Sequence, residues 1–411
     1  MVIIMELFEI TKEEFDVFCK QYECQNFFQC GYMKDMFDLE GKENYLIGLK
    51  DEGKLVAATL LVHRTTFLGS KMFEAVKGFI LDYRNCDVLD EMTKQTYAFI
   101  KKHGGYRLLI SPYVPVVERD TDAQIVDGGI DNRDICQYLE SIGYHDIGKG
   151  PQVKWNYVLD INNQTPEQLL ASFRPNTRNY INRTINKYHL IHKTLKFDEL
   201  SEFKKITSDT CERRGFGDKT LEYYQNMFTT FKDQVTFQIV LLDCDVYIKA
   251  LEDENKEFLR RIEELSDAPS NVKKKEVMKK DYEANLRKIE ETKTLKAEKG
   301  NIIPLSGAMF MLYGREIIYL FSGSYKEYMN FCGQYRLQWE IIKYAAINHY
   351  ERYNFFGIQD VFDPNGKDYG VYEFKKGFNG YVEELFNVYE YGKGIKYTLH
   401  RTLSKLKKLI K

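Results

Sequence analysis

Residues 247–299 restrict the possible fold more than any other part of the chain. Most of this segment is Lys, Arg, Glu or Asp, and its apolar residues form two narrow stripes at helical spacing. Narrow stripes with charged flanks are typical of a coiled coil, and Pro269 between the stripes interrupts the helix. We therefore predict an antiparallel coiled-coil hairpin with arms of roughly 30–35 Å. The stripes are Leu251, Phe258, Ile262 and Leu265, followed by Met278, Tyr282, Leu286 and Ile289.

Strand patterns on both sides of this segment predict that the hairpin is inserted into a larger domain. A chain of 411 residues exceeds the usual limit of one hydrophobic core. Residues 1–150 alternate helical and strand patterns, and residues 151–380 repeat that order of elements. We expect an α/β (α+β) fold with two similar domains. We assign residues 1–150 together with 381–411 to the first domain, residues 151–380 to the second and residues 247–299 to its inserted arm.

Two local signals in the first 60 residues are specific. Thr11 with Glu14 three residues later predicts a capping box at the start of a helix. Residues 51–53, Asp-Glu-Gly, lie between two apolar and β-branched runs and predict a hairpin turn.

Charge and cysteine content exclude several classes of protein. The net charge is −2, so an anionic partner must be bound by local patches. The eight cysteines show no CxxC motif and no Cys/His zinc spacing, which favours scattered reduced thiols. There is no run of about 18 apolar residues, and the first residues lack the basic region of a signal peptide. We expect a cytoplasmic protein with no metal and no bound cofactor.

The last 21 residues, "YGKGIKYTLHRTLSKLKKLIK", contain seven Lys or Arg and no acidic residue. Apolar residues at helical spacing, beginning with Ile395, Leu399 and Leu403, predict an amphipathic helix. Such a helix can pack on the core or lie against anionic lipid, and the pattern leaves both open. The basic residues that would contact lipid are Lys396, Arg401, Lys405, Lys407, Lys408 and Lys411.

The segment 368–391, "DYGVYEFKKGFNGYVEELFNVYEY", reads as two strands around a tight basic loop. In an extended segment successive side chains point to opposite faces. We therefore expect Lys375 at the end of a strand and Lys376 facing solvent. By itself, Lys375 could be an ordinary solvated lysine or a fixed cation in a site.

Several stretches together resemble the FemABX family, the aminoacyltransferases that build the interpeptide bridges of cell-wall peptidoglycan. The resemblance is strongest in "GAMFMLYGREIIYLFSGSYKEY", "LQWEIIKYA", "RYNFFGI" and "DYGVYEFKKGFNG", and weaker in "VKGFILDY", "TRNYINR" and "TCERRGF". It implies two acetyltransferase-like (GNAT) domains, the second of which often carries a helical hairpin.

The activity that the resemblance implies is transfer of Gly, Ala or Ser from aminoacyl-tRNA. The acceptor is the stem peptide of a lipid-linked peptidoglycan precursor (lipid II, or the UDP-muropeptide). Aminoacyl-tRNA is a co-substrate and no cofactor is needed. The protein is expected in the cytoplasm, in contact with the inner face of the membrane.

The resemblance also implies roles for individual residues. Phe374 and Lys375 match an FKxGF-like motif at the reaction centre, where an ammonium can stabilise a tetrahedral oxyanion. Ser111 stands where many members have an acidic residue, so the general base stays open. The expected substrate-binding residues are Tyr325 at the acceptor, Arg213 or Arg214 and Lys34 at the precursor phosphates, and Asp82 near the cleft.

Two other functions are compatible with the sequence. The first is a GNAT-type acyl-CoA N-acyltransferase, which uses a [QR]xxGxG/A loop at a helix N-terminus. The stretch "RRGFGDK" has the glycines but not their surroundings. The second is a non-catalytic protein that binds tRNA or membranes through the helical arm and the basic tail.

Overall fold

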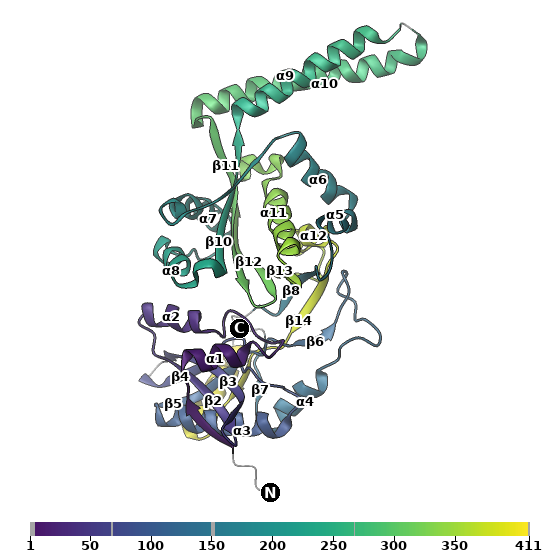
Figure 1. Cartoon of the computed structure of the whole chain (residues 1–411). Coiled ribbons are helices and arrows are strands. Elements are labelled where there is room, and N and C mark those ends of the chain that lie inside the picture. The colour runs from purple at the N-terminus through teal and green to yellow at the C-terminus, as the bar shows by residue number, and fades with distance from the viewer. Residues whose placement is uncertain (1–4, 67–68, 149–152, 267, 410–411) are drawn as a thin grey trace.

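The computed structural model describes residues 5–66, 69–148, 153–266 and 268–409. Two β-sheets, each flanked by helices, lie one above the other, and a long helical hairpin projects from the second sheet (Figure 1). The mixed α/β class predicted from the sequence is confirmed.

Within these ranges, seven strands form the first sheet, in the spatial order β1-β2-β3-β4-β5-β15-β7. Neighbours are antiparallel apart from the parallel pair β4 and β5. A parallel pair needs a crossover connection, and helix α3 (Cys86–Lys102) supplies it. The strands are β1 (Met5–Glu9), β2 (Asn44–Asp51), β3 (Lys54–Thr65), β4 (Lys71–Ala75), β5 (Gly105–Ile110), β15 (Tyr389–Tyr391) and β7 (His145–Asp146).

The second sheet has eight strands among the described residues, in the order β6-β14-β8-β13-β12-β11-β10-β9. It repeats the plan of the first sheet, because β12 and β13 run parallel and helix α11 (Gly333–Ile347) connects them. The strands are β6 (Pro115–Glu118), β14 (Tyr381–Leu385), β8 (Trp155–Asp160), β13 (Arg352–Gly357), β12 (Glu316–Ser324), β11 (Ile302–Tyr313), β10 (Val235–Asp243) and β9 (Ile191–Thr194).

Two strands connect the sheets. β6 follows the first-sheet strand β5, and β14 precedes the first-sheet strand β15, yet both lie in the second sheet. The chain therefore crosses between the sheets at both places. The domain boundaries given above stay a proposal.

Helices cover both sheets and also join them. α2 packs against α8, and a single apolar cluster contains Phe27 of the first part and Phe231 of α8, with their rings 6.4 Å apart. Besides α3, α11 and the two helices of the arm, the α-helices of the described residues are α1 (Lys12–Cys19), α2 (Gly31–Leu39), α4 (Arg133–Ser141), α5 (Pro166–Ser172), α6 (Pro175–Asn186), α7 (Leu200–Arg214), α8 (Leu221–Phe231), α12 (Tyr369–Lys376) and α13 (Ile395–Leu409).

Both local predictions in the first 60 residues are confirmed. Thr11 caps α1, and its side chain and that of Glu14 form the expected reciprocal hydrogen bonds. Glu52 and Gly53 join β2 and β3 with positive φ angles of 46° and 83°, the conformation that tight hairpins require.

The inserted arm consists of α9 (Cys244–Glu264) and α10 (Pro269–Lys299), which pack against each other between β10 and β11. Pro269 does not end the first helix, which stops at Glu264. It is the first residue of α10, a position that needs no backbone donor. Leu251 and Ile289 are buried at the root, whereas Leu286 is 44% exposed, so the predicted second stripe is only partly covered.

The predicted strand-loop-strand at 368–391 is wrong in its first half. Residues Tyr369–Lys376 form helix α12, and strands follow only at β14 and β15. The buried residues of α12 are Tyr372, Lys375 and Lys376, spaced i, i+3 and i+4 as on one face of a helix. The many aromatic residues of the segment favoured a strand prediction, and the helical spacing of Tyr372, Lys375 and Lys376 was therefore not recognised.

Candidate active site

Lys375 lies at the C-terminal end of α12 with its ammonium group inside the protein. Its Nζ is 2.7 Å from the carbonyl oxygen of Phe355, 3.3 Å from that of Phe356 and 2.7 Å from that of Gly357. Only 4% of the residue is exposed. The three N–H groups of a charged lysine thus match three carbonyl acceptors.

These carbonyl oxygens can accept hydrogen bonds from Lys375 because the pairing of β13 with its neighbouring strands is irregular here. Its parallel pairing with β12 ends at Asn354, and its register with β8 shifts between Asn354 and Gly357. Phe356 adopts a positive φ of 62°. Buried carbonyls that leave a sheet need another donor, and Lys375 provides it.

Burial opposes the charge on Lys375. It lowers the pKa of the amine to about 7 from the ordinary 10.5, because the charged form is removed from water. Lys375 has no carboxylate partner among the ion pairs of the described residues. A small change in its surroundings can therefore change its charge near neutral pH, a property common at reaction centres.

Lys376 is buried, so the prediction that it faces solvent is wrong. Its Nζ forms ion pairs with Asp122 at 2.7 Å and Glu373 at 3.0 Å. The hydroxyl of Tyr372 donates to the carbonyl of Thr121 at 2.8 Å. On a helix, unlike a strand, consecutive lysines do not take opposite faces. Lys376 and Tyr372 together hold α12 against the loop around residue 121.

A pocket of about 390 Å³ lies beside Phe374, between α6, α11 and α12. The ring of Phe374 packs on the edge of Tyr335 at a centroid distance of 4.9 Å, and Tyr335 faces Tyr180 at 4.8 Å. Arg174 at the rim is 4.0 Å from Glu373. The pocket therefore combines aromatic faces with one weakly paired cation. Its lining is Arg174, Pro175, Asn176, Thr177, Tyr180, Tyr335, Glu373, Phe374 and Gly377.

Three predicted residues come together at the end of α7. Arg213 donates to the carbonyl of Ser324 at 2.9 Å, and Tyr325 is the next residue. Arg214 pairs with Asp368, the residue before α12, at 3.4 Å. This segment therefore connects the end of β12 with the start of the helix that carries Lys375.

Lys34 and Asp82 lie elsewhere. Lys34 pairs with Asp38 on α2 at 2.7 Å. Asp82 accepts a hydrogen bond from the backbone N–H of Arg84 at 2.9 Å and lines a larger cleft of about 940 Å³ between the sheets. Neither residue lines the pocket beside Phe374 or contacts Lys375 in the part of the chain that the structure describes.

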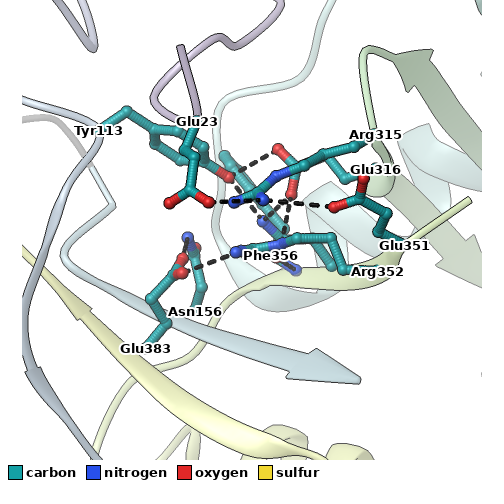
Figure 2. A network of polar contacts seen from close by, with 10 residues as sticks. Glu23, Tyr113, Asn156, Arg315, Glu316, Glu351, Arg352, Phe356 and Glu383 are labelled. Carbon is teal, nitrogen blue, oxygen red and sulfur yellow. Dashed lines mark hydrogen bonds and ion pairs between the residues drawn. The ribbon is translucent and has the colours of Figure 1, made fainter. Parts of the chain in front are cut away.

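Sequence reasoning missed a buried polar network at the wall of the larger cleft. Figure 2 shows Arg352 between Glu316 and Glu383, at 3.1 and 2.9 Å. The hydroxyl of Tyr113 donates to Glu316 at 2.7 Å, and Asn354 donates to that hydroxyl at 3.0 Å. Two buried carboxylates share one guanidinium here, and burial raises the pKa of Glu316. These residues lie far apart in the sequence and form no local motif.

Ser111, which replaces an expected acid, has a structural contact. Its hydroxyl accepts the backbone N–H of Lys77 at 2.9 Å. The side chain of Lys77 donates to the carbonyl of Val153 at 2.8 Å, and burial lowers its pKa to about 8. Lys77 is thus a third buried lysine, in addition to Lys375 and Lys376.

Within the described ranges, no three His, Cys, Asp or Glu side chains are placed to hold a metal ion. In the same part of the chain, no helix is long and apolar enough to cross a bilayer.

Comparison with known proteins extends over almost the whole chain. A model of the FemAB family matches residues 10–405. The aminoacyltransferase FemA of Staphylococcus epidermidis is 30% identical over 421 residues, covering 98% of this chain and 100% of that protein. FemA of Staphylococcus aureus is 28% identical over 419 residues, covering 98% and 99%. A crystal structure of FemX has the same fold, with a TM-score of 0.74 at 22% identity over 97% of this chain and 99% of its own.

Proposed function

Because the chain belongs to the FemAB family, we propose that this aminoacyltransferase extends the interpeptide bridge of peptidoglycan. It transfers Gly, Ala or Ser from aminoacyl-tRNA to the stem peptide of a lipid-linked precursor. The names of its full-length relatives support the aminoacyl transfer. The amino acid, the tRNA donor and the lipid-linked acceptor are parts of the proposal.

The reaction needs alignment and charge stabilisation more than it needs a strong base. The acceptor amine forms a C–N bond to the aminoacyl carbonyl carbon, and a tetrahedral oxyanion results. The ester C–O bond then breaks, and the ribose hydroxyl leaves with a proton that the amine has lost. An aminoacyl ester is already activated, so the protein must hold both reactants and stabilise the oxyanion.

The observation that carries the proposal is the geometry of Lys375. A buried ammonium with carbonyl partners only can exchange its weakest contact for a stronger, charged acceptor. That contact is the one to Phe356 at 3.3 Å. We propose that the oxyanion replaces this carbonyl. The negative charge then also favours the charged form of Lys375, whose pKa burial has lowered to about 7.

The pocket beside Phe374 is the proposed position of the aminoacyl end of the donor. Its aromatic rings, Phe374, Tyr335 and Tyr180, can stack on a base, and its volume of about 390 Å³ lies at the small end of ligand sites. A small transferred residue is consistent with this size.

Among the proposed acceptor residues, Arg213 is the better phosphate ligand. Arg214 is paired with Asp368 at 3.4 Å, whereas Arg213 donates to the neutral carbonyl of Ser324 at 2.9 Å and its ion pair with Asp209 is longer, at 3.8 Å. A guanidinium on a neutral acceptor can be exchanged for phosphate with a gain in charge pairing. The acceptor roles of Tyr325, Lys34 and Asp82 stay proposals.

The lipid-linked acceptor suggests a use for α13. Its inner face is anchored by the buried Tyr397 and by Arg401, which pairs with Glu390 at 3.2 Å. Its other face exposes Ile395 (88%), Leu399 and Leu403. An exposed apolar stripe beside basic residues can lie at an anionic membrane surface. Because Arg401 is already paired with Glu390, we assign the basic contact with lipid to Lys396. The side chains of the other expected lipid contacts, Lys405, Lys407, Lys408 and Lys411, lie outside the described residues.

The test is a transfer assay with purified protein. Radiolabelled glycyl-, alanyl- or seryl-tRNA is mixed with a lipid-linked muropeptide or with the UDP-muropeptide. Label in the muropeptide supports the proposal and identifies both substrates. Acetyl-CoA turnover without label transfer from any of the three donors contradicts it.

A further inference from the structure

A long acid-free segment runs beside the pocket. Between Glu167 and Asp198 the chain contains six Lys or Arg and no acidic residue, although the protein as a whole is slightly acidic. Lys193 is paired with Glu199 at 2.8 Å. The remaining five are Arg174, Arg178, Arg183, Lys187 and Lys196. Four of these lie on or next to helix α6.

Three cations lie near the C-terminal end of α6, close enough for the charges of Lys187 and Arg183 to act on Lys288. Arg183, Lys187 and Lys288 of α10 form no ion pair among the described residues. Arg183 donates to the hydroxyl of Tyr188, and its guanidinium lies 5.3 Å from that ring. Burial lowers the pKa of Lys288 and the charges of Lys187 and Arg183 lower it further, while the carboxylates of Glu254 and Asp281 act in the opposite direction. Glu254 itself accepts a hydrogen bond from Asn285 at 2.8 Å.

Aromatic packing connects this end of α6 to the root of the helical arm. The ring of Tyr188 is 5.7 Å from that of Tyr247 on α9, and both belong to the apolar cluster that includes Ile289 of α10. Arg174, immediately before α6, and Tyr180, in the middle of α6, line the pocket beside Phe374. In Figure 1, α6 lies between α5 and the arm. The cations thus mark a path from the pocket to the arm root, about 18 Å along the 12 residues of α6.

We propose that Arg183, Lys187 and Lys288 bind consecutive phosphates of the donor RNA, which runs from the pocket along α6 to the root of the arm. This inference rests on the proposed function, because that function requires an RNA whose 3′ end enters the pocket. Clustered cations without acidic partners are the usual contact for a phosphate backbone. An RNA strand also suits a path that begins at stacked aromatic rings.

The experiment measures binding of a labelled, non-aminoacylated tRNA at several salt concentrations. The variant is Lys187→Glu/Lys288→Glu in the full-length protein. The control is Lys101→Glu/Lys102→Glu on α3 of the first sheet, which changes net charge equally and alters two exposed residues. Each lost phosphate contact should reduce the slope of log affinity against log salt by roughly 0.7–0.9.

We expect the Lys187/Lys288 variant to lose at least about 10-fold in affinity and roughly 1.5 in slope, with the control close to wild type. Equal affinity and slope in the two variants overturn the proposed path.

A failure of the RNA path can be distinguished from a failure of the proposed function. If wild type transfers an amino acid from aminoacyl-tRNA but both variants bind tRNA equally, the path is wrong and the function stands. If the variant alone loses tRNA affinity but no aminoacyl-tRNA acts as donor, the path stands and the function fails.

Discussion

The side-chain nitrogen of Lys375 lies 2.7 Å from the carbonyl oxygen of Gly357. Because Gly357 ends β13 and Lys375 ends α12, this contact joins the sheet to the helix beside the proposed donor pocket. A substitution of Lys375 therefore acts on stability and on charge, and the two effects need separate measurements.

Lys375 should make the folded state more stable as the pH rises from about 7 to 10.5. Burial lowers its pKa to about 7 from 10.5, so in this window the unfolded chain binds a proton that the folded chain has released. Stability rises with pH where the unfolded state binds more protons, by at most about 1.4 kcal/mol per pH unit for one group. Urea unfolding of wild type and Lys375→Met at several pH values measures the difference in slope. Equal slopes for the two proteins would show that Lys375 stays charged in the folded state.

Lys376→Met should destabilise the protein by about 1–2 kcal/mol. The substitution leaves Asp122 and Glu373 without their shared cation, and both partners are partly exposed, which limits the loss. Urea unfolding midpoints test this, with Lys101→Met as the control on an exposed helix position. A midpoint equal to the control would contradict the anchoring of α12 by Lys376.

Reversing the pair Arg214 and Asp368 should separate positioning from phosphate binding. Arg214→Glu places two acids at a 3.4 Å contact and should reduce transfer roughly 3- to 10-fold. The double variant Arg214→Glu/Asp368→Arg should recover most of the rate, because the pair is restored with the charges exchanged. If the double variant does not recover the transfer rate and its KM for the acceptor is raised, Arg214 binds the acceptor directly.

Tyr113→Phe should cost about 1–3 kcal/mol of stability. It removes the hydroxyl that donates to the Oε1 atom of the buried Glu316 at 2.7 Å, and a buried acceptor left without its donor costs stability. Thermal or urea unfolding gives the value. An unchanged midpoint would mean that Glu316 finds another donor, such as Asn354, which is already 3.4 Å away.

Local and repetitive features were predictable from the sequence. The cap at Thr11, the turn at Glu52 and Gly53 and the paired helices of the arm all follow from residue types at short spacing. The two-sheet plan followed from the repeated order of elements and from the resemblance to a family.

The surroundings of the site were not predictable, for a physical reason. The buried ammonium of Lys375 binds three carbonyls at residues 355–357, where the register of β13 with β8 is irregular, and no sequence pattern marks that irregularity. Arg352 likewise meets Glu316 and Glu383 only through the pairing of distant strands. Polar contacts of this kind are set by tertiary structure, not by spacing.

We propose that the charge of Lys375 supports aminoacyl transfer. The direct test is the single-turnover rate of label transfer from aminoacyl-tRNA to the muropeptide for wild type and Lys375→Met. Tyr113→Phe, with its expected loss of about 1–3 kcal/mol, serves as a destabilised control. We predict a decrease of about 100-fold or more for Lys375→Met, the usual effect of removing an oxyanion donor, with tRNA binding retained and Tyr113→Phe near wild type. A rate for Lys375→Met within about 3-fold of Tyr113→Phe, far short of the effect of losing an oxyanion donor, would contradict the account.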